Sequence, residues 1–170
     1  MLDVLMRAEA ALPELIPELL DPKGSWSSLA VRYHPPFVDR LWRPFEDRYR
    51  LYLHRIHACS KRDALFHPHP WPSAMRVLKG NYEMAVGYGA GSEPPPIAAT
   101  FHLKPGSAYE MTDPDAWHYV RPLSDEYTYS IMVTGEPWSR TSPGTGETHR
   151  ALNTIEFNNL YMFFSTHYGH

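Results

Sequence analysis

Cysteine is nearly absent from this 170-residue chain, which has Cys59 and no other. A lone cysteine cannot form an internal disulfide, so a disulfide-stapled scaffold is excluded and a reducing compartment is compatible with the sequence. Long apolar runs are missing as well: no stretch approaches about 18 uninterrupted apolar residues, and the N-terminus lacks the form of a signal peptide. We therefore expect a cytoplasmic protein with no membrane partner.

Basic clusters are also lacking. The chain has 16 Lys and Arg against 19 Asp and Glu, a net charge of −3, and no Lys/Arg run interleaved with aromatics. These features argue against a nucleic-acid partner. No repeat of solenoid period is visible. What the chain does contain is 43% hydrophobic residues and 14% aromatics, enough for one core, and we expect a single domain over residues 1–170.

One segment, residues 66–73, concentrates candidate metal ligands. It reads Phe-His-Pro-His-Pro-Trp-Pro-Ser, with histidines at positions 67 and 69. Side chains two residues apart fall on the same face of an extended strand, so His67 and His69 can reach one metal ion. The interleaved prolines rule out a central helix and hold the backbone extended. The segment therefore predicts a pre-organised ligand pair.

The pattern around this pair resembles the first motif of the cupin superfamily, in which two histidines are followed by a Glu and then a Gly. Here Ser73 stands in the Glu place and Gly80 in the Gly place. The family's second motif supplies a later histidine, which His118 matches. The resemblance implies an all-β fold, a single cupin-type double-stranded β-helix (jelly-roll) barrel with an N-terminal helical segment. It also implies that His67, His69 and His118 are the metal ligands.

A site that lacks the Glu ligand is similar to that of the cysteine dioxygenase branch of the cupins, in which three histidines hold a non-haem Fe(II). Residues 76–82 also resemble a strand and Gly-Asn turn of that branch. Three neutral imidazoles leave a divalent ion with its full charge, which favours an anionic substrate. The resemblance implies an Fe(II) dioxygenase that uses O2 and a small anionic thiol or carboxylate. The alternatives are a non-catalytic metal or ligand-binding module, and an isomerase or hydrolase using Zn or Mn; Ni is a further candidate metal.

Three other residues are candidate catalytic groups. Arg55 lies in an alternating strand over residues 49–59, whose periodicity leaves open which face lines the barrel. If its face turns inward, its guanidinium can clamp a substrate carboxylate; the alternative is a position at the barrel rim. Ser73 could orient water or substrate, and Tyr109 lies on a strand near the third ligand. We interpret His54 and His57, on the same strand as Arg55, as hydrogen-bonded strand histidines.

The rest of the chain is expected to frame the barrel. Residues 1–48 form a helical and covering segment, with one kinked or two short helices over residues 2–20 and an irregular stretch over 24–47. The barrel core spans residues 49–138. Residues 139–170 are a loop and an apolar, aromatic C-terminal tail. The tail must pack on its own barrel or on a second subunit. Together with the resemblance, it predicts a homodimer.

Two short turns within the core are expected to join neighbouring strands. Residues 79–81 would close a hairpin between strands over 74–78 and 82–88. Residues 104–106 would connect strands over 97–103 and 107–111. A last strand is expected over 127–134, followed by a surface loop over 139–148.

Overall fold

A computed structural model describes residues 1–139 and 149–169 of the chain. The helical elements are α1 (Leu2–Leu15), the short 3₁₀ helix η1 (Pro17–Leu20) and α2 (Thr154–Tyr168). The strands are β1 (Ser27–Val31), β2 (Val38–Phe45), β3 (Tyr49–Ile56), β4 (His67–Pro68), β5 (Ser73–Lys79), β6 (Tyr82–Tyr88), β7 (Ala99–Leu103), β8 (Ala108–Met111), β9 (Ala116–Pro122) and β10 (Thr128–Thr134). No helix in this described part is both long and apolar enough to cross a membrane.

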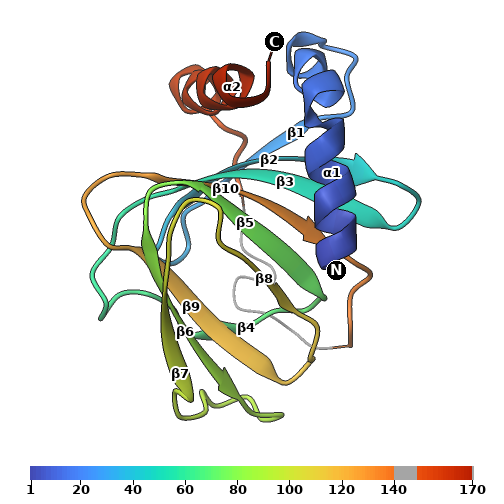
Figure 1. The fold of residues 1–170 in the computed structure, drawn as a ribbon. Coiled ribbons are helices and arrows are strands. Elements are labelled where there is room, and N and C mark those ends of the chain that lie inside the picture. Colours follow the sequence, from blue (N-terminus) through green and yellow to red (C-terminus); the bar gives the residue numbers. More distant parts are fainter. Residues whose placement is uncertain (140–148, 170) are drawn as a thin grey trace.

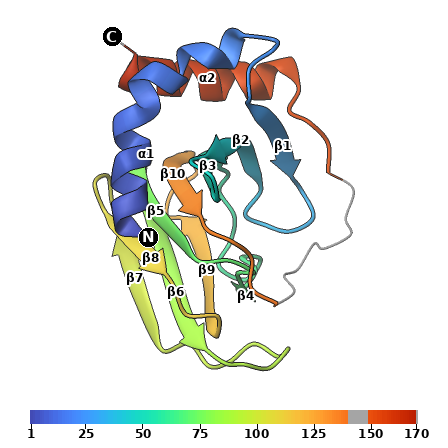
Figure 2. The same ribbon diagram turned by 90° about the vertical axis from the view of Figure 1, so that its right-hand side faces the viewer.

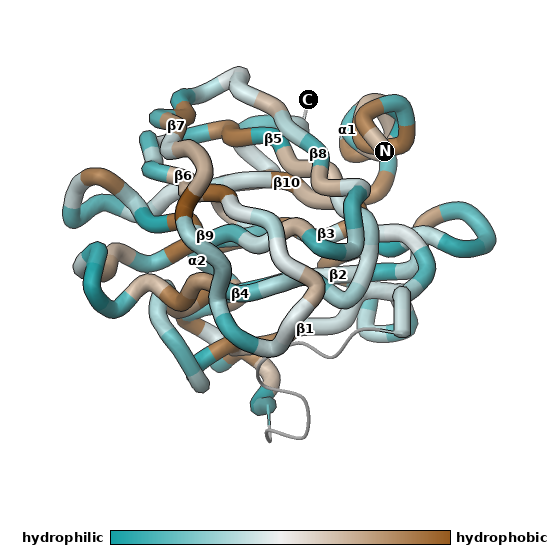
Figure 3. Tube along the Cα trace, turned by 90° about the horizontal axis from the view of Figure 1, so that it is seen from below, coloured by the Kyte–Doolittle hydropathy of each residue, from teal (hydrophilic) through white to brown (hydrophobic). Residues whose placement is uncertain are grey.

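The strands form two antiparallel sheets (Figure 1). A six-stranded sheet has the order β1-β2-β3-β10-β5-β8, and a four-stranded sheet has the order β4-β9-β6-β7. The expected all-β jelly roll is confirmed, although the described strands remain two separate sheets and do not close into one barrel. In Figure 3 the loops that project from the sheets are largely hydrophilic, as expected for solvated connections.

Helices α1 and α2 cover the face of the six-stranded sheet that points away from the four-stranded sheet (Figures 1 and 2). The residues of α1 that repeat every three or four positions are buried there, together with Leu160 and Phe164 of α2. Leu51 and Leu53 of β3 pack against them, whereas Tyr52 points between the sheets into a second cluster. Both faces of β3 are therefore buried, which is why its periodicity could not identify the inner face.

The two ends of the chain agree only partly with the structure predicted from the sequence. Residues 2–20 form two helices, one of the two expected arrangements. Pro17 takes the first position of η1, where its missing N–H costs nothing, whereas Pro13 lies inside α1 near its C-terminal end. The C-terminal tail packs on its own chain through α2, whose start is fixed by a capping box between Asn153 and Glu156. Its helical structure was not predicted. Of the surface loop expected over residues 139–148, all but residue 139 lie outside the described residues.

The expectation of an irregular stretch over residues 24–47 is wrong. This stretch holds β1 and β2, and β2 pairs with β3 over its full length. The sequence of β2 does not alternate between apolar and polar residues, and Pro44 near its end also argued against a strand. The six-stranded sheet is consequently wider than the sequence indicated, and it brings β2 side chains to the space between the sheets.

The two expected strand pairings across short turns are also wrong, although both turns are present. β5 pairs with β10 and β8, while β6 pairs with β9 and β7, so residues 79–81 carry the chain from one sheet to the other. The connection between β7 and β8 likewise changes sheets. Gly80 and Gly106 have φ values of 82° and 89°, a conformation that favours glycine in a corner as much as in a hairpin. Turn chemistry alone therefore does not distinguish the two.

Candidate metal centre

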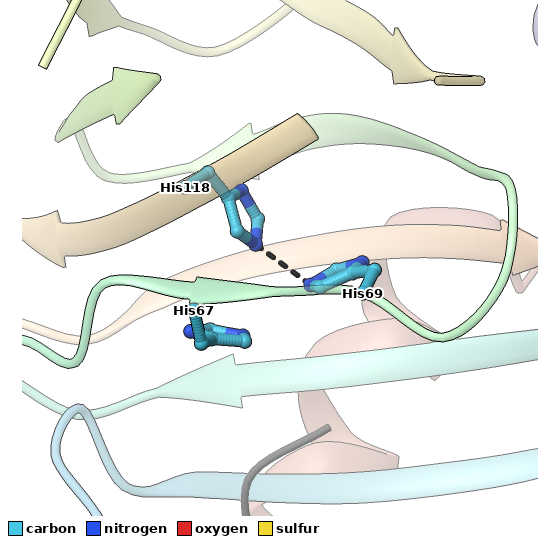
Figure 4. A group of neighbouring side chains, drawn as sticks. All are labelled: His67, His69 and His118. Carbon is cyan, nitrogen blue, oxygen red and sulfur yellow. Dashed lines mark hydrogen bonds between the residues drawn. The ribbon is translucent and has the colours of Figure 1, made fainter. Parts of the chain in front are cut away.

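Strands β4 and β9 bring the three predicted ligands together. In this antiparallel pair His67 lies opposite His118 and Pro68 lies opposite Trp117. His69 follows β4 by one residue and its ring turns to the same side (Figure 4). Residues opposite each other on paired strands have Cβ atoms about 5 Å apart, which is why histidines distant in sequence can share one ion.

The ligand nitrogens of the three histidines all lie within 4.8 Å of one another. Nε2 of His69 and Nε2 of His118 are 2.7 Å apart (Figure 4). Ring centroids are separated by 5.2 Å for His67 and His69, 5.1 Å for His67 and His118, and 4.3 Å for His69 and His118. Three imidazoles that converge in this way can hold a divalent metal ion.

Burial keeps these imidazoles neutral. It lowers the pKa of His67 to about 4, and it lowers the pKa values of His69 and His118 well below the usual range. Nδ1 of His67 lies 2.8 Å from the carbonyl oxygen of Leu65, so Nδ1 carries the proton and Nε2 is left as an acceptor. Neutral imidazole is the form that binds metal, and the donor set therefore fits a divalent ion.

A pocket of about 120 Å³ opens between the two sheets around the histidines. Its walls come from β1, β2, β3, β5, β9 and β10 as well as from the segment that carries the His pair. The apolar side chains among its described lining residues include Val31, Val38, Ile56, Trp71, Met75, Val120 and Met132. Arg40 is the one charged side chain among the described residues that line it.

Comparison with known proteins bears on the fold. No protein-family model and no curated protein matches the sequence. Among solved structures, Fe(II)-HppE with the alternative substrate (S)-1-HPP aligns with a TM-score of 0.50 and 14% identity, covering 65% of this chain and 56% of that one. The cupin domain of Cnp3 from Schizosaccharomyces pombe aligns with a TM-score of 0.42 and 10% identity, covering 58% and 60%. The fold of this chain is similar to that of the HppE structure.

A further similar structure is KdgF from Halomonas sp., with a TM-score of 0.46 and 12% identity, covering 69% of this chain and 93% of that one. The chain spans only 50% to 60% of the length of the HppE structure, the Cnp3 domain and hydroxypropylphosphonic acid epoxidase from S. wedmorenis. At identities this low a likeness concerns the fold alone. The chemistry of the site has to be argued from the residues of this chain.

Ser73, in the Glu place of the cupin motif, is buried at the start of β5. Its Oγ lies 3.5 Å from Nδ1 of His69, on the opposite side of the ring from the Nε2 that meets His118. It is not among the described residues that line the pocket. The structure therefore places Ser73 behind one ligand, where it can steady the imidazole, and not beside the point where the nitrogens converge.

Arg55 faces away from the three histidines. It lies on the face of β3 that points toward α2, and its Nε and Nη2 donate to Oδ2 of the buried Asp39 at 2.7 and 2.6 Å. His57, on the same face, is also bonded to Asp39, at 2.9 Å. The condition for a role in clamping substrate, an inward-turned face, is not met. Arg55 instead neutralises a buried carboxylate.

Tyr109 lies on β8 and is separated from the metal pocket by Met75. Its hydroxyl is 3.4 Å from Sδ of Met75 and 3.4 Å from the hydroxyl of Tyr82. Met75 lines the metal pocket, whereas Tyr109 lines a different cavity between β7 and β8. Of the three candidate catalytic residues, the structure thus brings only Ser73 into contact with a ligand.

Two residues that sequence reasoning did not place in the site lie in it. Arg40 and His54, paired across β2 and β3, both line the pocket, and Nε of Arg40 donates to Nε2 of His54 at 3.0 Å. The prediction that His54 is a hydrogen-bonded strand histidine is confirmed. Arg40 was missed because its strand was interpreted as irregular: residues 39–42, Asp-Arg-Leu-Trp, do not alternate between polar and apolar, so no pattern in the sequence indicated the face of Arg40.

Proposed function

We propose that this chain is a metal-dependent enzyme, a non-haem Fe(II) dioxygenase acting on a small anionic substrate of the thiol or carboxylate class. The observation that carries the proposal is the convergence of three neutral imidazoles, of which His118 is buried and His67 and His69 are half-buried. The one charged residue among the described residues that line their pocket is an arginine. His67, His69 and His118 would hold the ion. When bound, Fe(II) supplies one centre at which an anionic substrate and O2 can meet.

The donor set favours an anion. Three imidazoles contribute no negative charge, and no Asp or Glu is among the described residues that line the pocket. A carboxylate ligand would cancel part of the ion's charge, so its replacement by Ser73, which stands behind His69, leaves that charge available to substrate. The site as a whole is electropositive once a divalent ion is bound.

Arg40 supplies a second attraction for an anion. Its positive charge is felt across the pocket, since it contributes to lowering the pKa values of His67 and His69 after the larger effect of burial. In the described part of the chain no carboxylate lies within ion-pair distance of Arg40. A guanidinium without an acidic partner, inside a pocket, is suited to a substrate carboxylate or similar anion. Arg40 thus takes the role that the sequence assigned conditionally to Arg55.

The size and walls of the pocket limit the substrate to a small molecule. Its volume of about 120 Å³ is well below the roughly 300–1,000 Å³ typical of sites for drug-sized ligands. Trp71, Met75 and Met132 contribute apolar walls that would exclude water from the region around the three histidines once a substrate fills the pocket. Exclusion of water strengthens the attraction between Arg40 and an anion and protects reactive species from hydrolysis.

Two other functions use the same centre. A non-catalytic cupin would hold metal or a small ligand without turnover, and a Zn or Mn enzyme would use the ion as a Lewis acid for isomerisation or hydrolysis. Ni remains a further candidate metal. The electropositive pocket favours an anionic ligand in each case, so metal identity and O2 use are the properties that separate these functions.

The experiment is reconstitution of metal-free protein under anaerobic conditions with Fe(II), Zn(II), Mn(II) or Ni(II). O2 uptake is then followed with a panel of small thiols and carboxylates. The proposal predicts O2 uptake with Fe(II) only, dependent on one anionic compound and abolished by His118→Ala. Turnover without O2 in the Zn or Mn protein would replace it with the Lewis-acid function. Tight binding of an anion with no product from any metal form would favour the non-catalytic module.

A further inference from the structure

Arg40 is held at a single nitrogen by His54. The two residues are direct partners in the antiparallel pair of β2 and β3, and the bond from Nε of Arg40 to Nε2 of His54 is 3.0 Å long. A ring nitrogen that accepts a hydrogen bond carries no proton, so this bond assigns the proton of neutral His54 to Nδ1. His54 is only 3% exposed, and the packing around it leaves its ring little freedom.

A second contact holds the plane of the same guanidinium. Cζ of Arg40 lies 5.0 Å from the ring centre of Tyr52, a buried neighbour of His54 on the inner face of β3. Nε is therefore used by His54 and one face by Tyr52. Within the described residues, Nη1 and Nη2 of Arg40 make no hydrogen bond. These two nitrogens form the end-on edge of the guanidinium, which can hold a carboxylate through two parallel bonds.

We propose that His54 is a positioning residue that fixes Arg40 so that its end-on edge, and not its Nε side, receives the anionic group of the substrate. The inference rests on the proposed function, because it assumes that Arg40 binds substrate. A free arginine side chain samples many rotamers, and the conformational entropy that it loses on binding weakens the affinity for substrate. A guanidinium that is already fixed at Nε and stacked on Tyr52 loses little further entropy when the substrate binds.

His54 has no other role in the described site. Its Nε2 is occupied by Arg40, and it is not one of the three histidines whose ligand atoms converge. Packing alone would be served by an apolar side chain of similar volume, whereas orienting Arg40 requires an acceptor at the position of Nε2. Gln at position 54 can supply an acceptor, and Leu cannot. The pair of variants therefore separates positioning from packing.

The test uses protein loaded with Co(II), whose visible spectrum reports ligand binding at the metal, titrated with acetate as the anionic probe. His54→Leu should weaken acetate binding about tenfold, since a hydrogen bond to a charged group is worth roughly that factor. His54→Gln should stay within about threefold of the wild type, and Co(II) affinity should be alike in all variants. Independently of the metal, the Nε–H proton of Arg40 should be protected from exchange in the wild type and in His54→Gln, and exposed in His54→Leu.

Arg40→Leu separates the two levels of the proposal. If Arg40→Leu loses acetate binding while His54→Leu binds acetate as the wild type does, the positioning role is overturned and the role of Arg40 stands. If Arg40→Leu binds acetate normally, the anion site at Arg40 is wrong and the positioning role falls with it. Should His54→Leu fail to fold, His54→Asn takes its place, because the shorter Asn amide does not reach the guanidinium; wild-type acetate affinity in that variant would equally overturn the inference.

Discussion

His67 and His118 face each other directly across the β4–β9 pair, so two of the three predicted ligands are fixed by strand register and not by a flexible loop. A shift of one residue in this pairing would turn His118 to the other side of its strand. The third predicted ligand, His69, is one residue beyond the pair, and its Nε2 lies 2.7 Å from Nε2 of His118. The geometry of the centre is thus a property of the sheet.

The first prediction concerns these ligands. His67→Ala, His69→Ala or His118→Ala should abolish stoichiometric metal binding while the protein remains folded, because the larger hydrophobic cluster lies on the far side of the six-stranded sheet. Metal analysis and circular dichroism of each variant check this. His102→Ala is the matched control, since His102 is an exposed strand histidine. Full metal content in any ligand variant would show that the group does not hold the ion.

The second prediction concerns pH and the metal-free protein. Burial lowers the pKa of His67 to about 4, below the roughly 6.5 of an unfolded histidine. The unfolded chain therefore binds more protons than the folded one as the pH falls between these values. The free energy of unfolding should be constant above pH about 6.5 and decrease from there toward pH 4. Urea denaturation at pH 7.5 and pH 5 measures this decrease.

His67→Phe should make this decrease in the free energy of unfolding smaller, because it removes one imidazole that becomes protonated when the chain unfolds at low pH. His102→Ala should leave the decrease unchanged. A metal-free protein whose stability is equal at the two pH values would show that these imidazoles are not held neutral by burial.

The third prediction concerns Ser73. Its hydroxyl lies 3.5 Å from Nδ1 of His69, so Ser73→Ala should weaken metal binding by up to about tenfold, the low end of the effect of losing a group that orients a ligand. Ser73→Thr, which keeps the hydroxyl, is the control. Calorimetric metal titration measures the difference. Equal affinity in Ser73→Ala and the wild type would leave Ser73 as no more than a small residue in a tight place.

The fourth prediction concerns Asp39, whose fully buried carboxylate accepts bonds from Arg32, Arg55 and His57. Burial alone would raise the pKa of this carboxyl, but these bonds together lower it far below its usual range. Asp39→Asn leaves the buried Arg55 without its counter-charge and should lower the free energy of unfolding by about 3–5 kcal/mol. Glu46→Gln, which breaks a solvent-exposed pair with Arg7, should change the free energy of unfolding far less.

Metal stoichiometry should be unchanged in folded Asp39→Asn, because this network lies on the opposite face of β3 from the centre. Urea denaturation compares the two variants. A cost below that of the exposed pair would contradict the account of Asp39 as the buried counter-charge of Arg55.

The homodimer stays a prediction. The aromatic tail that suggested it packs on its own chain, where Phe163 stacks on Tyr129 with ring centroids 3.9 Å apart. Ile155 and Met162 remain 74% and 61% exposed on α2. If a second copy covers them, light scattering should give twice the monomer mass, and Met162→Lys should shift the equilibrium toward monomer. A monomer mass at all concentrations would remove the dimer.

The sequence was informative wherever one local pattern had one structural solution. The spacing of His67 and His69 predicted a shared face, and the resemblance to cupins added His118 and the jelly roll. Strand pairing was not accessible in the same way, since the turn at Gly80 suits a hairpin and a corner between sheets equally well. The side of β3 that carries Arg55 could not be predicted either, because hydrophobic clusters bury both faces.

Arg40 illustrates the same limit. Its role depends on the pairing of β2 with β3, a contact between residues 14 apart in sequence that no local pattern encodes. Tyr109 and Arg55 were chosen by residue type. In the structure Met75 separates Tyr109 from the metal pocket, and Arg55 lies on the opposite face of the six-stranded sheet from that pocket. Metal binding could be predicted for residues 66–73, because the histidine motif lies within that segment. The residues that surround the histidines, such as Arg40, could be identified only from the tertiary structure.

Metal content is the most direct test of the central claim, that His67, His69 and His118 form a metal centre. Protein purified without a histidine tag should contain about one divalent ion per chain by elemental analysis, and the His67→Ala/His118→Ala double variant prepared in parallel should contain none. Iron in the wild type, removable by a chelator and restored by Fe(II), is the result that the account predicts. Wild-type protein that holds no more metal than the double variant, and takes up none on titration, would contradict it.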